Sequence, residues 1–163
     1  LWDRVRNGLE SVEVDKRYSR FVRGFIASTS KRNSEIAEQI LEEALTDEVL
    51  APGFPILQTE ATITDAGIRR LLQSLSDGVA PLWIYRYLGY GRVPHTIQDE
   101  GLCNLIRTIF YQQNGQSVAI EILHMRLHGS EDIRTPIISL GQELLREFIF
   151  DRELTGRDNL AYP

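Results

Sequence analysis

The sequence predicts an all-α fold built from stacked antiparallel helix pairs. Apolar residues recur at helical spacing through most of the 163 residues. Short stretches with proline or glycine, such as "APGFP", "SDG" and "QNGQ", separate these segments and end helices. Strand patterns are short, and "ATIT" at 61–64 is the best of them. A closed, irregular helical bundle is the alternative arrangement of the same helices.

Seven helices are expected, over 15–29, 34–46, 65–76, 81–92, 97–112, 116–128 and 135–151. In the first, Tyr18, Phe21, Val22, Phe25 and Ile26 share one side of a helical wheel. This stripe predicts a helix whose apolar side faces a core.

Capping residues and prolines set the ends of the next segments. Asn33 or Ser34 can cap 34–46, and the prolines of "APGFP" at 51–55 predict an irregular connection after it. Thr64 can cap 65–76, and Pro81 suits the first turn of 81–92.

The later helices follow the same rules. Thr96 can cap 97–112, and "QNGQ" turns the chain into 116–128. Pro136 opens the last helix, 135–151.

Core positions line up between three units, 15–46, 65–92 and 97–128, which predicts an internal repeat. The matched positions are Phe21, Leu71 and Leu105 in the first helices, and Ile36, Ile84 and Val118 in the second. Leu71 and Leu105 are 34 residues apart, as are Ile84 and Val118.

In this spacing the chain resembles tetratricopeptide and HEAT-like helical repeats. More faintly, it resembles the helical-repeat regions of large bacterial multidomain NTPases, in which the repeats sense a partner and another domain does the chemistry. The resemblance implies an α-solenoid with a curved surface that binds a protein partner.

Composition indicates one globular helical domain over 1–151, with 152–163 as a tail or linker. The start at Leu1 and the loop-like end suggest a piece of a longer protein. Neither a signal peptide nor an apolar stretch long enough for a bilayer is evident, and Cys103 is the single cysteine. A cytoplasmic location with no membrane contact is therefore expected.

The best candidates for a partner-binding surface are arginines and tyrosines on the second helices of the repeats. Tyr and Arg are the usual hot-spot residues of protein interfaces. By the 34-residue offset, Arg92 and Arg126 occupy equivalent positions. The predicted partner-binding residues are Arg86, Tyr87, Tyr90, Arg92 and Arg126. For Arg126 a buried ion pair, with Asp99 among the possible partners, is the alternative.

A basic segment near the N-terminus is the candidate nucleic-acid face. Its residues are Lys16, Arg17, Arg20, Arg23, Lys31 and Arg32. The net charge of −5 makes nucleic acid an unlikely partner, and the acidic helix with Glu35, Glu38, Glu42 and Glu43 can pair with this face instead.

The sequence contains little that indicates metal binding or catalysis. Glu121, His124 and His128 lie at spacings of three and four residues, but they fall in the polar sector of their helix, so a solvated face is expected. Phosphate-loop and nucleophile-elbow patterns are missing, and Cys103 sits among apolar residues. The sequence thus predicts a non-catalytic interaction or scaffolding module without metal or cofactor; a metal-binding or catalytic bundle is the alternative.

Overall fold

The computed structural model describes residues 2–9, 11–13, 16, 20–128 and 135–148, and within them every regular element is a helix. The predicted all-α class is confirmed. The elements are α1 (Trp2–Leu9), α2 (Arg20–Arg32), α3 (Ser34–Thr46), the 3₁₀ helix η2 (Ala51–Gly53), α4 (Phe54–Gln58), α5 (Asp65–Asp77), the 3₁₀ helix η3 (Leu82–Gly89), α6 (Val93–Thr96), α7 (Asp99–Phe110), α8 (Gln116–Leu127) and α9 (Thr135–Glu147).

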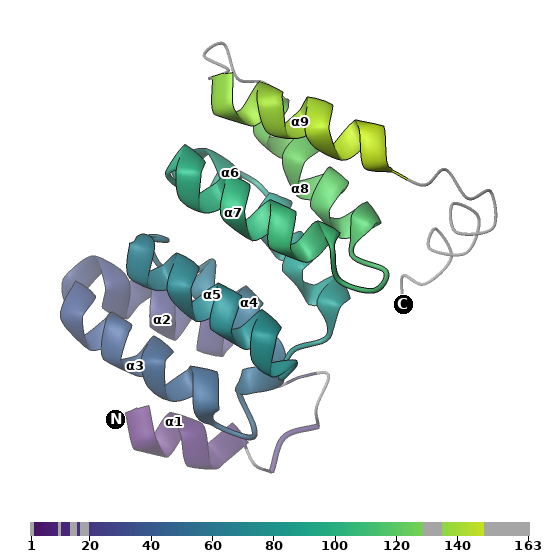
Figure 1. Ribbon diagram of the computed structural model, residues 1–163. Coiled ribbons are helices and arrows are strands. Elements are labelled where there is room, and N and C mark those ends of the chain that lie inside the picture. Colours follow the sequence, from purple (N-terminus) through teal and green to yellow (C-terminus); the bar gives the residue numbers. More distant parts are fainter. Residues whose placement is uncertain (1, 10, 14–15, 17–19, 129–134, 149–163) are drawn as a thin grey trace.

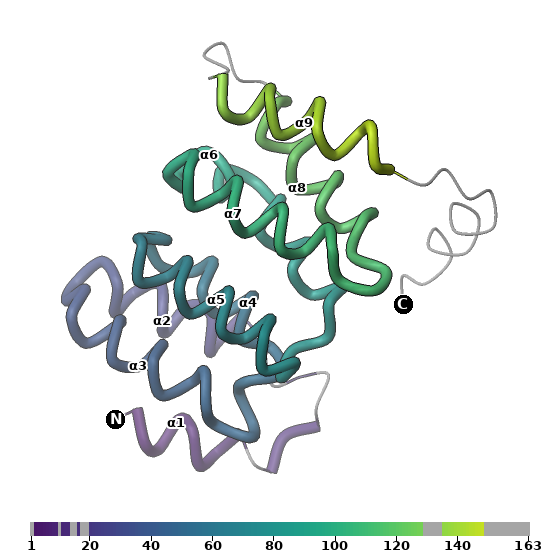
Figure 2. Tube along the Cα trace, in the orientation of Figure 1, coloured from purple at the N-terminus to yellow at the C-terminus, as the bar shows by residue number. Residues whose placement is uncertain are grey.

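The helices stack in chain order in two layers (Figures 1 and 2). Helices α3, α5, α7 and α9 contact one another in sequence and form one layer. Helices α2, α4, η3 and α8 form the other in the same way. The two layers bury a single apolar core, and α1 and α9 lie at opposite ends of the stack.

Local signals explain the helix ends. The Asn33 side chain accepts a hydrogen bond from the backbone N–H of Ile36 at 3.1 Å and caps α3. The Thr64 hydroxyl does the same for Gly67 at the start of α5. Gly78 ends α5 with φ of 63°, a left-handed conformation that glycine adopts without strain.

The 51–58 segment, predicted as an irregular connection, is helical. Pro52 and Pro55 stand in the first turns of η2 and α4, where the missing N–H has no partner to lose. Phe54 and Leu57 are completely buried. This short helix is the element of the α2 layer that the sequence pattern did not reveal.

The extra helix corrects the predicted repeat. Helix α2 was matched with α5 and α7, but it lies in the layer of α4, η3 and α8. Accordingly Phe21 is 68% exposed and Ile36 is 46% exposed, whereas Leu71 and Leu105 are fully buried. The units over 65–92 and 97–128 were in phase with each other, but the unit over 15–46 was one helix out of phase.

Four predicted helices differ from the observed ones in type or by more than one residue, and the first of them, predicted over 15–29, is described as α2 over Arg20–Arg32. Residues 82–89 form a 3₁₀ helix, since Leu82, Tyr85 and Leu88 recur at the three-residue spacing that aligns side chains in this helix. Helix α7 begins at Asp99, and Thr96 bonds the carbonyl of Val93 instead of capping it. Helix α9 ends at Glu147, and the predicted tail at 152–163 lies outside the described residues.

Helix α1 closes one end of the stack. The Trp2 indole N–H donates to Glu43 of α3 at 3.0 Å, and its ring stacks on Phe25 with centroids 5.8 Å apart. Arg6 pairs with Asp47 at 3.6 Å. None of the helices in the described ranges has both the length and the apolarity needed to cross a bilayer.

Candidate interaction surface

Two predicted partner-binding residues, Tyr87 and Tyr90, form a pair at the end of η3. Side chains three residues apart eclipse one another in a 3₁₀ helix, which brings these rings together. Their centroids are 5.0 Å apart and the planes are tilted by 53°. Tyr87 is half-buried and Tyr90 is 38% exposed. One aromatic wall, open to solvent on one side, results.

A glycine turn places a charge beside this pair. Gly91 has φ of 60°, which lets the chain reverse between η3 and α6. Arg92 follows immediately and is exposed. In the part of the chain that the structure describes, the Arg92 side chain makes neither a hydrogen bond nor an ion pair, while its backbone carbonyl accepts a bond from the His95 N–H. Its guanidinium is therefore available to a ligand.

These residues line a surface hollow of about 380 Å³. Its lining residues come from α2, the end of α4 and the corner between η3 and α6; they are Arg23, Thr59, Glu60, Tyr87, Tyr90, Gly91, Arg92 and Val93. Tyr87, Tyr90 and Arg92 were predicted to bind a partner, and the structure brings them together. We call this site the Tyr–Arg hollow.

Arg23 joins the Tyr–Arg hollow from α2, although the sequence suggested it for the nucleic-acid face. Its Nε donates to Glu60 Oε1 at 2.5 Å. Both side chains are partly shielded from water, which strengthens the pair relative to a fully exposed one. This neighbour could not be read from the sequence because α2 and η3 are joined only through α4, the helix that the pattern missed.

The other two predicted partner-binding residues lie elsewhere. Arg86 is half-buried, and its Nε lies 3.6 Å from Glu121 Oε2 on α8. Arg126 is buried, and its Nη2 donates to Asp99 Oδ1 at 2.9 Å. A partner-binding role for Arg126 is therefore corrected to the buried ion pair. The supposed equivalence with Arg92 also fails, because Arg92 lies beyond the end of η3 and is exposed.

The remaining basic residues of the candidate nucleic-acid face have different surroundings. Lys16 bonds Glu13, and Arg17 lies outside the described residues. Arg20, Lys31 and Arg32 are exposed on α2.

The acidic helix α3 has other partners than this basic segment. Arg70 is 2% exposed and donates to Glu38 at 2.6 Å and to Glu42 at 3.3 Å, and Arg69 also bonds Glu42. Glu43 accepts from Trp2. The charges of α3 thus hold α5 and α1 in place.

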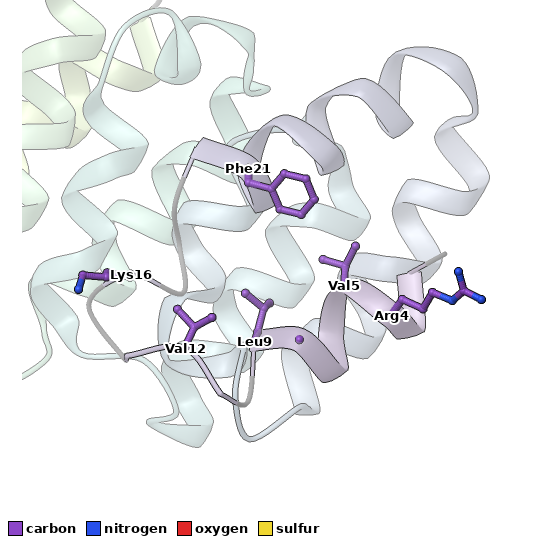
Figure 3. Close-up of a pocket in the computed structure, with 7 residues that line it drawn as sticks. Arg4, Val5, Leu9, Val12, Lys16 and Phe21 are labelled. Carbon is purple, nitrogen blue, oxygen red and sulfur yellow. The ribbon is translucent and has the colours of Figure 1, made fainter.

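A second hollow, of about 340 Å³, lies between α1 and the start of α2 (Figure 3). Figure 3 shows Val5, Leu9 and Val12 pointing towards Phe21, while Arg4 and Lys16 extend away on either side. Sequence reasoning placed Phe21 in the core and did not expect α1. Since α2 belongs to the other layer, Phe21 covers this hollow and not the main core.

The histidines and the cysteine do not converge. His124 and His128 are exposed, with ring centroids 5.8 Å apart, and Glu121 pairs with Arg86. Burial raises the pKa of the Cys103 thiol, which keeps it protonated and weakly nucleophilic. No cluster of three or more metal-ligating side chains occurs in the described ranges.

Comparison with protein-family models, curated proteins and solved structures gives no match. Function must therefore be argued from the chemistry of the chain itself.

Proposed function

We propose that this chain is a non-catalytic protein-interaction or scaffolding module and that a protein partner binds at the Tyr–Arg hollow. The observation that carries the proposal is the meeting of Tyr87, Tyr90 and Arg92 around one hollow on the surface. Tyrosine and arginine dominate the binding energy of many protein interfaces, because each combines a large contact area with polar groups.

The hollow is also preformed. Its walls include side chains from α2 and η3, and η3 packs directly against α4 and α8. Arg23 and Tyr87 lie on helices that pack into the stack, so these two side chains lose less freedom on binding than side chains on loose loops would. Its volume lies near the lower end of the roughly 300–1,000 Å³ typical of ligand pockets.

The stacked architecture supports the scaffolding part of the proposal. Two layers of helices that contact their neighbours in chain order resemble the organisation of tetratricopeptide and HEAT-like solenoids. Such stacks present extended surfaces to partners and commonly form part of larger proteins. We place this chain in that role, with a separate domain supplying any chemistry.

A pull-down from source-cell lysate tests the proposal. Wild-type protein is compared with the variant Tyr87→Ala, Tyr90→Ala, Arg92→Ala, whose folding is checked by circular dichroism. Tyr111→Ala is the matched control, because this tyrosine is 58% exposed and lies at the end of α7, outside the Tyr–Arg hollow. We expect a protein partner that wild type and control retain and the triple variant loses.

Other results would contradict the proposal. A partner retained equally by the triple variant would show that binding occurs elsewhere on the stack. Recovery of only nuclease-sensitive material would favour the basic residues of α2 and a nucleic-acid-binding domain. Recovery of no specific partner by any of the proteins would count against an interaction module.

A further inference from the structure

We infer that Arg23 and Arg92 form a carboxylate clamp in the Tyr–Arg hollow and that the partner presents an acidic residue next to an apolar one. This inference rests on the proposed function and specifies the chemistry of the partner segment. The acid is held between the two guanidinium groups, while the neighbouring apolar side chain packs against Tyr87 and Tyr90.

The charge of the hollow favours an anion. Its charged lining residues are Arg23, Glu60 and Arg92, so two positive charges stand against one negative charge. This local excess occurs in a chain whose net charge is −5. A partner selected by charge complementarity at this site therefore carries a negative group.

Glu60 holds the Arg23 guanidinium in position and leaves its Nη groups available to a ligand. It accepts a bond from Nε of Arg23 only, and a guanidinium has five N–H donors. Within the described residues, the Nη groups of Arg23 have no other bond. A guanidinium held at Nε and open at Nη suits a carboxylate, whose oxygens accept parallel N–H bonds.

Arg92 supplies the second arm. Its side chain is exposed and without a bonding partner in the described ranges, so its guanidinium can bind an acid without first breaking a bond. The paired tyrosine rings could also attract a cation over their faces. The guanidinium groups of Arg23 and Arg92 repel a cation at this site and attract a carboxylate, which is therefore the favoured ligand.

The test uses two small probes of known structure, acetyl-Asp-Phe-amide and acetyl-Asn-Phe-amide. Each is titrated into ¹⁵N-labelled protein, and the amide resonances are followed by NMR. We expect the Asp peptide to shift the resonances of Tyr90, Arg92 and Arg23 saturably. The Asn peptide should bind about tenfold more weakly, because its amide keeps one acceptor oxygen but lacks the negative charge and the second acceptor oxygen of the carboxylate.

Variants test whether the clamp causes the difference in affinity between the Asp and Asn peptides. Arg92→Gln should lower the preference for the Asp peptide, because only the Arg23 arm remains, and Arg92→Lys should restore part of the preference, since lysine keeps the charge but lacks the fork. Arg146→Gln is the control, because Arg146 is exposed on α9 and does not line the hollow. It should leave the preference unchanged.

The outcomes separate this inference from the proposed function. Equal binding of both peptides at the hollow would overturn the clamp but keep the hollow as an interface. A preference for the Asp peptide that is undiminished in Arg92→Gln would also overturn the clamp. Shifts confined to residues outside the hollow, or none, would overturn the inference, while the pull-down would still decide whether a protein partner binds.

Discussion

The ion pair between Arg126 and Asp99 gives the sharpest stability prediction. Both side chains are at least nine-tenths buried, and Nη2 lies 2.9 Å from Oδ1. Arg126→Met keeps an unbranched apolar stem but removes the charge, leaving the Asp99 carboxylate buried without its guanidinium. Breaking a buried pair in this way costs about 3–5 kcal/mol. Asp99 is also the first residue of α7, and the helix N-terminus returns about 1 kcal/mol to a negative charge.

The expected loss of unfolding free energy is therefore about 3 kcal/mol. In a chain of this size that corresponds to a fall in Tm of about 6–12 °C. Urea titrations followed by circular dichroism measure it directly. The double variant Asp99→Asn, Arg126→Met should recover about 2 kcal/mol, because the buried carboxylate that lost its guanidinium is removed as well. A single variant within about 0.5 kcal/mol of wild type, or strict additivity in the double variant, would refute this account of Arg126.

Two further predictions concern glycine and tyrosine. Gly115→Ala should destabilise the chain severely, because a β-carbon would lie 1.8 Å from the Ile109 carbonyl oxygen, whereas Gly24→Ala meets nothing within 4 Å and should stabilise α2 by about 0.5–1 kcal/mol. Thermal melts of both variants check this, and equal effects of the same sign would contradict it. Burial raises the pKa of Tyr85 to about 12, so the folded state holds this proton more tightly than the unfolded state, and unfolding free energy should fall as pH rises from about 10 to 12. Tyr85→Phe should lessen that fall in urea titrations at pH 9 and 11, and an unchanged pH dependence would show that another group causes it.

Helices with a cap and a regular apolar stripe could be predicted from the sequence alone. The bounds of α3 match the expected 34–46, and Asn33 and Thr64 cap as expected. In these segments the capping hydrogen bonds and the apolar periodicity both predict the same helix, and tertiary packing agrees with that helix.

The elements that were not predicted, such as α4, carry local sequence signals that point to a different structure. Prolines in "APGFP" were interpreted as breakers, although Pro52 and Pro55 occupy first turns. Trp83 is 55% exposed, because the three-residue period of η3 turns it away from the ridge that Tyr85 occupies. Without α4, the first unit slipped by one helix, and Phe21 was placed in a core that it does not reach.

The candidate site was partly predictable for a related reason. Tyr87, Tyr90 and Arg92 are neighbours in sequence, so their grouping on one short segment was visible. Arg23 and Glu60 belong to other helices, and only the stacking of α2 and α4 beside η3 brings them to the same hollow. Long-range proximity of this kind depends on the layer order, which the apolar pattern did not fix.

The central claim is that a protein partner binds at the Tyr–Arg hollow, and site-specific photo-crosslinking tests it most directly. Benzoylphenylalanine is placed at position 90 in one protein and at position 111 in another, and each is irradiated in source-cell lysate. The protein with the probe in place of Tyr90 should give a discrete crosslinked partner. The protein with the probe in place of Tyr111 should give none. A partner crosslinked from position 111 alone would contradict the central claim.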